Sequence, residues 1–114
     1  MELCGCRRMY MYLHYGGSFI VKGNKSVDYD GGSKSGAIID DGMSVEEVIS
    51  ICCKRFNISS EEKNVWYSLK FDRSILMPLV DDASLVEIFE FNEEYGFAYI
   101  ATGNVEVITD DNFL

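Results

Sequence analysis

The order of apolar and polar residues along the chain predicts several strands and two helices. Met9 to Tyr15 is apolar and aromatic throughout, Gly16-Gly17 follows, and Ser18 to Val21 is apolar again. Because glycine adopts the positive φ of a tight turn, we expect a β-hairpin whose turn is Gly16-Gly17. The other predicted strands are residues 37–39, 66–71, an irregular or edge strand at 75–79, and a final strand at 97–102.

The clearest helix runs from Ser44 to about Arg55. Ser44 and Glu47 have the spacing of a capping box, in which each side chain bonds the backbone N–H of the other residue. Apolar residues at 45, 48, 49, 52 and 56 form one stripe at helical spacing. This stripe predicts that Cys52 lies in the core with Cys53 beside it.

A second helix is predicted to begin near Asp81-Asp82, with one of these aspartates as its cap. Its inward-facing residues are Leu85, Ile88 and Phe89, and Tyr95-Gly96 ends it.

Paired strands with helices on one face are typical of an α+β domain. We favour a ubiquitin-like β-grasp, with a mixed sheet of four to five strands packed on one main helix and a second, shorter helix. Residues 1–8 are expected to be an N-terminal tail, 9–102 the domain, and 103–114 an acidic C-terminal tail or linker. Alternatively, residues 105–108 extend the sheet.

Charge narrows the set of partners. The 114 residues, 47% of them hydrophobic, carry a net charge of −9, and residues 58–114 hold twelve acids against three bases. An acidic surface suits a basic protein partner, although it can equally serve solubility. Because a nucleic-acid ligand needs cations to neutralise its phosphates, we expect no direct DNA or RNA binding.

The sequence shows no membrane or export segment. No apolar run reaches the roughly 20 residues of a membrane span, and the first residues lack the apolar block of a secretory signal. We therefore expect an intracellular location, in the nucleus or the cytoplasm.

The cysteines and the single histidine do not predict a catalytic or metal site. Cys4-x-Cys6 and the adjacent pair Cys52-Cys53 lack the spacing of zinc ligands. We expect free thiols and no metal or cofactor, and a redox or lipidation role for Cys4 and Cys6 stays open. With one histidine, His14, and no nucleophile elbow or His-Glu-x-x-His motif, the chain is not expected to be an enzyme or to take a small-molecule substrate.

Two resemblances extend this interpretation. Residues 11–19 resemble the opening hairpin of the Phox-and-Bem interaction domain, a β-grasp module whose first turn is often Tyr-Gly-Gly. Four segments, from about Met9 to Thr102, together resemble the N-terminal domain of plant Mutator-like transposases. They are His14–Phe19, Tyr29–Gly32, Asp40–Ser44 and Leu76–Asp82.

The resemblance implies a non-catalytic module that mediates protein association in a transposase-derived protein. In the family, an acidic loop and helix on one copy bind a lysine on the first strand of another copy. In this sequence the position of that lysine holds Tyr12, and the acidic loop is reduced to Asp72, which is followed by the basic Arg73. The predicted acidic partner-binding face is Asp72, Asp81, Asp82, Glu87 and Glu90, with Glu93 and Glu94. The predicted basic side is Arg7, Arg8 and Lys22.

The expected partner is a protein with a basic surface, or a second copy in weak self-association. The alternative is an accessory domain of a nucleic-acid-associated transposase that has no partner-binding face of its own.

Overall fold

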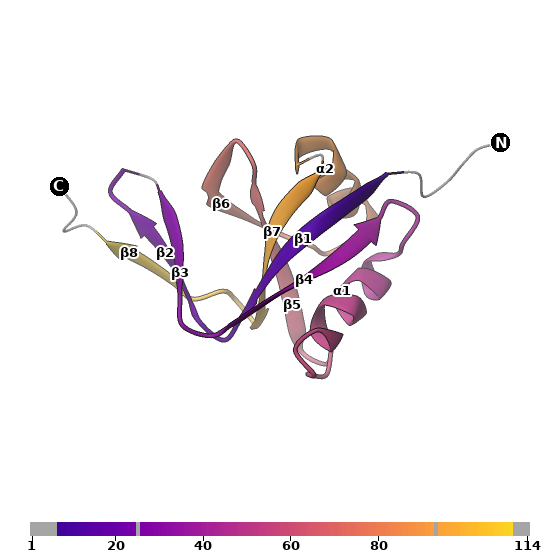
Figure 1. Ribbon diagram of the computed structural model, residues 1–114, viewed down its shortest axis with the longest axis horizontal. Helices are drawn as coiled ribbons and strands as arrows, with labels where there is room; N and C mark the ends of the chain where they lie inside the picture. Colours follow the sequence, from indigo (N-terminus) through magenta and orange to yellow (C-terminus); the bar gives the residue numbers. More distant parts are fainter. Residues whose placement is uncertain (1–6, 25, 93, 111–114) are drawn as a thin grey trace.

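The computed structural model describes residues 7–24, 26–92 and 94–110, which form an α+β fold with two sheets and two helices (Figure 1). The strands are β1 (Arg8–Tyr15), β2 (Ser18–Lys22), β3 (Val27–Asp30), β4 (Ser33–Asp40), β5 (Lys63–Leu69), β6 (Asp72–Pro78), β7 (Tyr95–Thr102) and β8 (Val107–Asp110). The helices are α1 (Val45–Lys54) and α2 (Asp82–Asn92). The five-stranded sheet has the order β4-β1-β7-β5-β6 and the three-stranded sheet the order β3-β2-β8.

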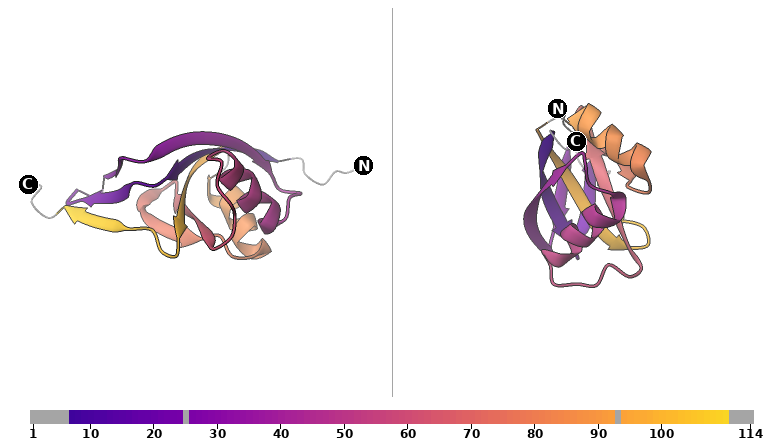
Figure 2. Two further views of the ribbon diagram at one scale, coloured as in Figure 1. Left: turned by 90° about the horizontal axis from the view of Figure 1, so that it is seen from below. Right: turned by 90° about the vertical axis from the view of Figure 1, so that its right-hand side faces the viewer.

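The two helices cover one face of the five-stranded sheet (Figure 2). Alternate residues of a strand point to opposite faces, and the odd-numbered residues Met9, Met11 and Leu13 of β1 are buried in the core with residues of both helices. The parallel pairing of β1 with β7 makes this sheet mixed, as predicted. The expectation that the second helix is the shorter one is wrong, because α2 has 11 residues and α1 has 10.

The predicted hairpin turn at Gly16-Gly17 is also wrong. β1 pairs with β4, from Arg8 opposite Asp40 to Tyr15 opposite Ser33, and β2 pairs with β3, from Ser18 opposite Asp30 onward. Both ladders share one antiparallel register, so residues 8–22 and 26–40 form a single long hairpin. Its tip lies where the Lys22 N–H donates to the Ser26 carbonyl at 2.9 Å.

The glycine pairs at 16–17 and 31–32 face each other halfway along this hairpin, where it passes from one sheet into the other. Gly16, Gly31 and Gly32 have φ of +88°, +75° and +70°, a region that favours glycine. The backbones also approach closely: a Cβ on Gly17 would lie 2.6 Å from the Gly31 carbonyl oxygen. The glycines therefore make a crossing between sheets rather than a reversal of the chain.

Part of the expected C-terminal tail is a strand. β8 pairs parallel with β2, from Phe19 opposite Val107 to Lys22 opposite Asp110. The strands β4, β1 and β7 are thus continued by β3, β2 and β8, which extend to the left in Figure 1. The alternative that residues 105–108 extend the sheet is wrong in detail, because the strand is Val107–Asp110 and belongs to the second sheet.

The helix caps agree with the sequence. The Glu47 N–H donates to Ser44 Oγ at 3.2 Å and the Ser44 N–H donates to Glu47 Oε1 at 2.9 Å, which confirms the capping box before α1. Before α2, Asp81 Oδ1 accepts from both the N–H and the hydroxyl of Ser84, each at 2.9 Å. The predicted inward residues of α2 are all buried: Leu85, Ile88 and Phe89.

Candidate functional site

The solvent-facing side of α2 carries three of the carboxylates singled out in the sequence. Asp82 and Glu90 lie four residues before and after Val86, so the three side chains share one line along the helix, with Glu87 beside it. All three carboxylates are exposed, and Val86 is 53% exposed. We call these four residues, Asp82, Val86, Glu87 and Glu90, the α2 surface.

Two other predicted acidic residues do not join this surface. The Asp81 carboxylate caps α2, and its hydrogen bonds with Ser84 hold its pKa below the ordinary value. Asp72 begins β6 and accepts from the Ser74 hydroxyl at 2.6 Å. The turn before Asp72 lies at the other end of α2, where Asn92 Oδ1 accepts from the Lys70 N–H at 2.7 Å. Glu93 lies outside the described residues.

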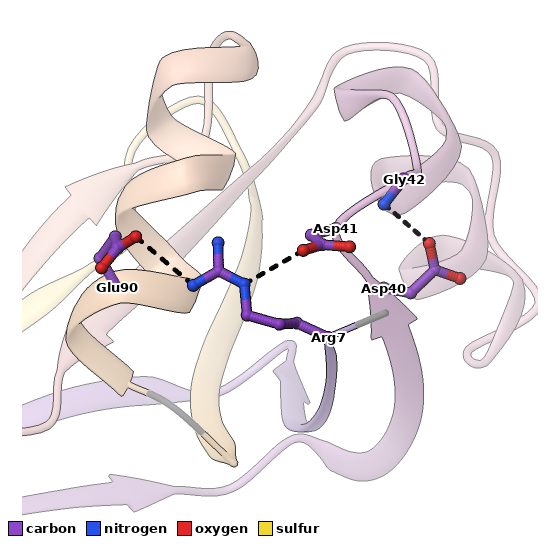
Figure 3. Close-up of polar contacts among 5 residues, drawn as sticks. All are labelled: Arg7, Asp40, Asp41, Gly42 and Glu90. Atoms are coloured by element: carbon purple, nitrogen blue, oxygen red, sulfur yellow. Dashed lines mark hydrogen bonds and ion pairs between the residues drawn. The ribbon is translucent and has the colours of Figure 1, made fainter. Parts of the chain in front are cut away.

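The predicted basic side is not a separate surface either. Arg7 Nε bonds Asp41 Oδ2 at 3.0 Å and its Nη1 lies 3.4 Å from Glu90 Oε1, while the guanidinium carbon is 5.5 Å from the centre of the Phe89 ring. Figure 3 shows Arg7 reaching from the start of β1 between α2 and the loop after β4. That loop is shaped by Asp40, whose Oδ1 accepts from the Gly42 N–H at 2.9 Å.

Arg8 and Lys22 lie apart from each other. Arg8 lines a shallow hollow of about 360 Å³ beside Arg7, Phe89, Glu90 and Glu94. Lys22 ends β2 in the three-stranded sheet, on the opposite side of the molecule from α2 in Figure 1, and its Nζ is 4.0 Å from Asp28. The three predicted cations are therefore divided: Arg7 and Arg8 lie beside α2, and Lys22 lies in the three-stranded sheet.

A groove runs between α2 and the loop after β4. It has a volume of about 280 Å³, with apolar side chains below and carboxylates at its rim. Its lining residues are Asp41, Gly42, Met43, Asp82, Leu85, Val86 and Phe89. An apolar floor with an acidic rim can receive the aliphatic stem of a lysine or arginine and pair with its charged end.

The opposite face of the five-stranded sheet holds a second feature, which the sequence interpretation missed. Tyr10 and Tyr12 of β1 lie beside Tyr95 and Phe97 of β7, aligned by the parallel register. Tyr12 stacks on Phe97 with ring centres 5.3 Å apart, and Tyr10 meets Tyr12 edge-on at 5.0 Å. Tyr10, Tyr12 and Tyr95 stay 43%, 45% and 38% exposed. We call these four residues the aromatic face.

The sequence carries a signal for this face. Residues 9–15 are apolar at odd and even positions alike, whereas a strand with one face in water alternates between apolar and polar residues. Such a run predicts a strand covered on both sides. Here the helices cover only the odd-numbered side, which leaves Tyr10 and Tyr12 uncovered.

A buried aromatic corner adjoins this face where the sheet bends. His14 stacks on Tyr99 at 4.7 Å and lies 4.9 Å from the Tyr29 ring, and the Tyr29 hydroxyl accepts from the Gly17 N–H at 2.8 Å. His14 Nδ1 is 3.0 Å from the Ala98 carbonyl, which assigns the ring proton to that nitrogen. Burial lowers the pKa of His14, so the ring is held neutral as a packing residue.

The described thiols are unsuited to reaction. Cys52 and Cys53 are free and buried in the core, and burial raises the pKa of Cys52 to about 12 and that of Cys53 in the same direction. Cys4 and Cys6 lie outside the described residues. Within residues 7–24, 26–92 and 94–110, no cluster of three His, Cys, Asp or Glu side chains could bind a metal ion. Neither described helix has the length and apolar character to cross a bilayer.

Comparison with known proteins identifies no relative, because no family model, curated protein or solved structure matches this chain.

Proposed function

We propose that this chain is a non-catalytic protein-interaction module whose α2 surface binds a basic segment of a partner protein. In this proposal the fold is a variant of the ubiquitin-like β-grasp, related to the Phox-and-Bem type domain of Mutator-like transposases. The observation that carries the proposal is the groove beside α2, where the exposed carboxylate of Asp82 lies next to the exposed side chain of Val86. The other carboxylate of the lining, Asp41, is partly buried and paired with Arg7.

Charge alone would give little affinity. Pairs between exposed ions contribute only about 0–1 kcal/mol each, and salt weakens them. Stable complexes instead depend on apolar or aromatic anchors near the centre of the interface, surrounded by a polar rim. Val86 and the groove supply such a centre, and Asp82 and Glu90 lie on either side of it.

Arg7 supports the choice of a cationic ligand. The guanidinium group is held by one carboxylate from the loop and one from α2, above the Phe89 ring. The protein thus already binds one arginine at one end of α2 by the contacts proposed for a partner. Asp82, on the rim of the groove, has no ion pair within the described part of the chain.

The test is binding of short peptides that place lysine or arginine on both sides of an apolar residue, followed by NMR shifts of backbone amides. We expect the shifts to concentrate on residues 82–90 and 41–43. The double variant Asp82→Lys/Glu90→Lys should abolish binding.

The matched control is Glu46→Lys/Glu61→Lys, which changes net charge equally at exposed positions that do not line the groove. Glu46 lies in the first turn of α1, as Asp82 lies in the first turn of α2. Both double variants therefore lose one favourable interaction between a carboxylate and the N-terminus of a helix. If the α2 variant binds the peptides as the control does, at equal thermal stability, the proposal is wrong. Sedimentation at several salt concentrations separates self-association from binding of another protein.

A further inference from the structure

We propose that the aromatic face binds single-stranded nucleic acid, with unpaired bases stacking on Tyr10, Tyr12 and Tyr95 and phosphates meeting the cations beside them. This inference is independent of the α2 surface, which lies on the other side of the sheet.

The rings form a platform across neighbouring strands. Tyr12 is at its centre, with ring centres at 5.0 Å to Tyr10, 5.3 Å to Phe97 and 6.2 Å to Tyr95. Tyr10 lies across Gly36 of the edge strand β4, where any Cβ would collide with the phenol oxygen. Open aromatic side chains on a sheet give stacking positions for bases, and every base has a face that can stack.

Cations lie on this platform. The Arg73 guanidinium carbon is 3.8 Å from the centre of the Phe97 ring, and Lys70 Nζ is 4.4 Å from the centre of the Tyr95 ring. Arg73 Nε is buried and has no hydrogen-bond partner among the described residues. Lys34 lies opposite His14 on β4, and the charges of Lys34 and Arg73 both act on the His14 ring.

The local charge differs from the net charge. The even-numbered residues of β1 and their partners in β4 share this face, and their charged members are Arg8, Lys34 and Asp40. Lys70 and Arg73 add two cations that contact its rings, with Asp72 between them in the chain. Arg8 also lines the hollow that contains Glu90 and Glu94, so cations and carboxylates are mixed beside this face. The exposed side of α2 lies on the other side of the sheet, and salt at physiological ionic strength screens charges over about 8 Å.

A single strand fits this chemistry better than a duplex. Base pairs in a duplex hide their faces inside the stack, so a duplex offers this platform only phosphates, which the net charge of −9 repels. An unpaired strand offers exposed base faces as well. Stacking then supplies the affinity that the small number of cations cannot supply alone.

The experiment is a titration with fluorescein-labelled oligothymidylate of about 12 nucleotides, at roughly 50 mM salt, read by fluorescence anisotropy. Trp66 provides a second readout, because it is the only tryptophan and lies opposite Tyr99 on the same face of the sheet. We expect saturable binding with quenching of Trp66. Unlabelled single strand should compete, and duplex of the same length should not.

Variants separate stacking from general apolar contact. Tyr12→Ala should weaken binding about tenfold, whereas Tyr12→Phe, which keeps the ring, should stay within about twofold. Ile38→Ala is the matched control, because Ile38 is 57% exposed on the same face but offers no ring. Arg73→Gln should lower the slope of log affinity against log salt by about one unit.

Three results would overturn this inference: no binding at low salt, equal loss in Tyr12→Ala and Ile38→Ala, or equal competition by duplex. The second would indicate that the face is a protein-docking surface instead. Asp82→Lys/Glu90→Lys should bind the oligonucleotide at least as tightly as the unchanged protein, so failure of the α2 proposal and failure of this one are distinguishable.

Discussion

Replacing Gly32 with alanine tests the crossing on which the arrangement of both sheets depends. Gly32 has φ +70°, and its added methyl group would lie 2.5 Å from the Gly17 nitrogen and 2.8 Å from the Gly16 carbonyl carbon. These are backbone atoms of the opposing strand, which cannot move aside as a flexible side chain can. We therefore expect Gly32→Ala to destabilise the protein strongly.

The magnitude follows from two separate costs. A left-handed conformation costs a residue with a Cβ about 1–2 kcal/mol. Forcing an extra carbon into a packed site costs about 1–3 kcal/mol more. The sum is about 2–5 kcal/mol, a large share of the roughly 5–15 kcal/mol that stabilises a typical domain.

Gly31→Ala is the matched control. Gly31 has φ +75°, but nothing lies within 4 Å of its added Cβ, so only the conformational cost applies, about 1–2 kcal/mol. Urea unfolding followed by circular dichroism measures both variants. With a slope of about 1–3 kcal/mol per molar urea, a loss of about 3 kcal/mol lowers the midpoint by roughly 1–3 M.

The difference between the two variants isolates the close approach of the strands. If Gly32→Ala loses no more free energy of unfolding than Gly31→Ala, the strands do not cross at this distance. The shared register of the two ladders would then be wrong, and with it the alignment of β2 and β3 beyond the bend.

Three further predictions concern stability and reactivity. Ser44→Ala should lower the free energy of unfolding by about 1 kcal/mol, while Ser50→Ala in the middle of α1 should change it by less than about 0.5 kcal/mol, measured by urea unfolding. Burial lowers the pKa of His14 in the folded state, so the unfolded chain binds the proton more tightly. The His14 contribution to the free energy of unfolding should therefore be fully present above about pH 6.5 and fall as the pH decreases toward the folded-state pKa. His14→Gln should remove that dependence on pH. In the folded protein, iodoacetamide at about pH 8 should leave Cys52 and Cys53 unmodified by mass mapping, and modification before unfolding would show that they are not buried.

Local features could be predicted from the sequence because neighbouring residues determine them. The capping box at Ser44 and the buried stripe through Cys52 follow from spacing within one helix, and both are present. The start of α2 after Asp81 follows in the same way. The α+β class also follows, since it depends only on the order of the elements.

Strand pairing could not be predicted, because two different structures need the same residues. Gly16-Gly17 adopts positive φ and close backbone contact whether the chain reverses or two strands cross. The two structures differ in what lies opposite Gly16-Gly17, which here is the second pair, Gly31-Gly32. Only the register of the folded hairpin brings the two glycine pairs together. The strand at residues 107–110 was missed for a related reason: its parallel partner, β2, lies about 88 residues earlier in the chain.

Net charge is a sum without positions, so it could not predict where on the surface the cations and carboxylates lie. The excess of acids in residues 58–114 includes the exposed side of α2, while Lys70 and Arg73, from the same half, lie on aromatic rings across the sheet. A thin two-layer fold keeps these groups apart, with the helices on one face and the aromatic face on the other. The two proposals therefore assign ligands of opposite charge to the two faces. Because a cationic peptide and a single strand also bind each other in free solution, the two faces are separated by variants rather than by a mixed titration. Tyr12→Ala should weaken only binding of the single strand, and Asp82→Lys/Glu90→Lys should weaken only binding of the peptide. Loss of both ligands in either variant, at unchanged thermal stability, would mean that one face accounts for both and that the separation of charge across the sheet has no functional role.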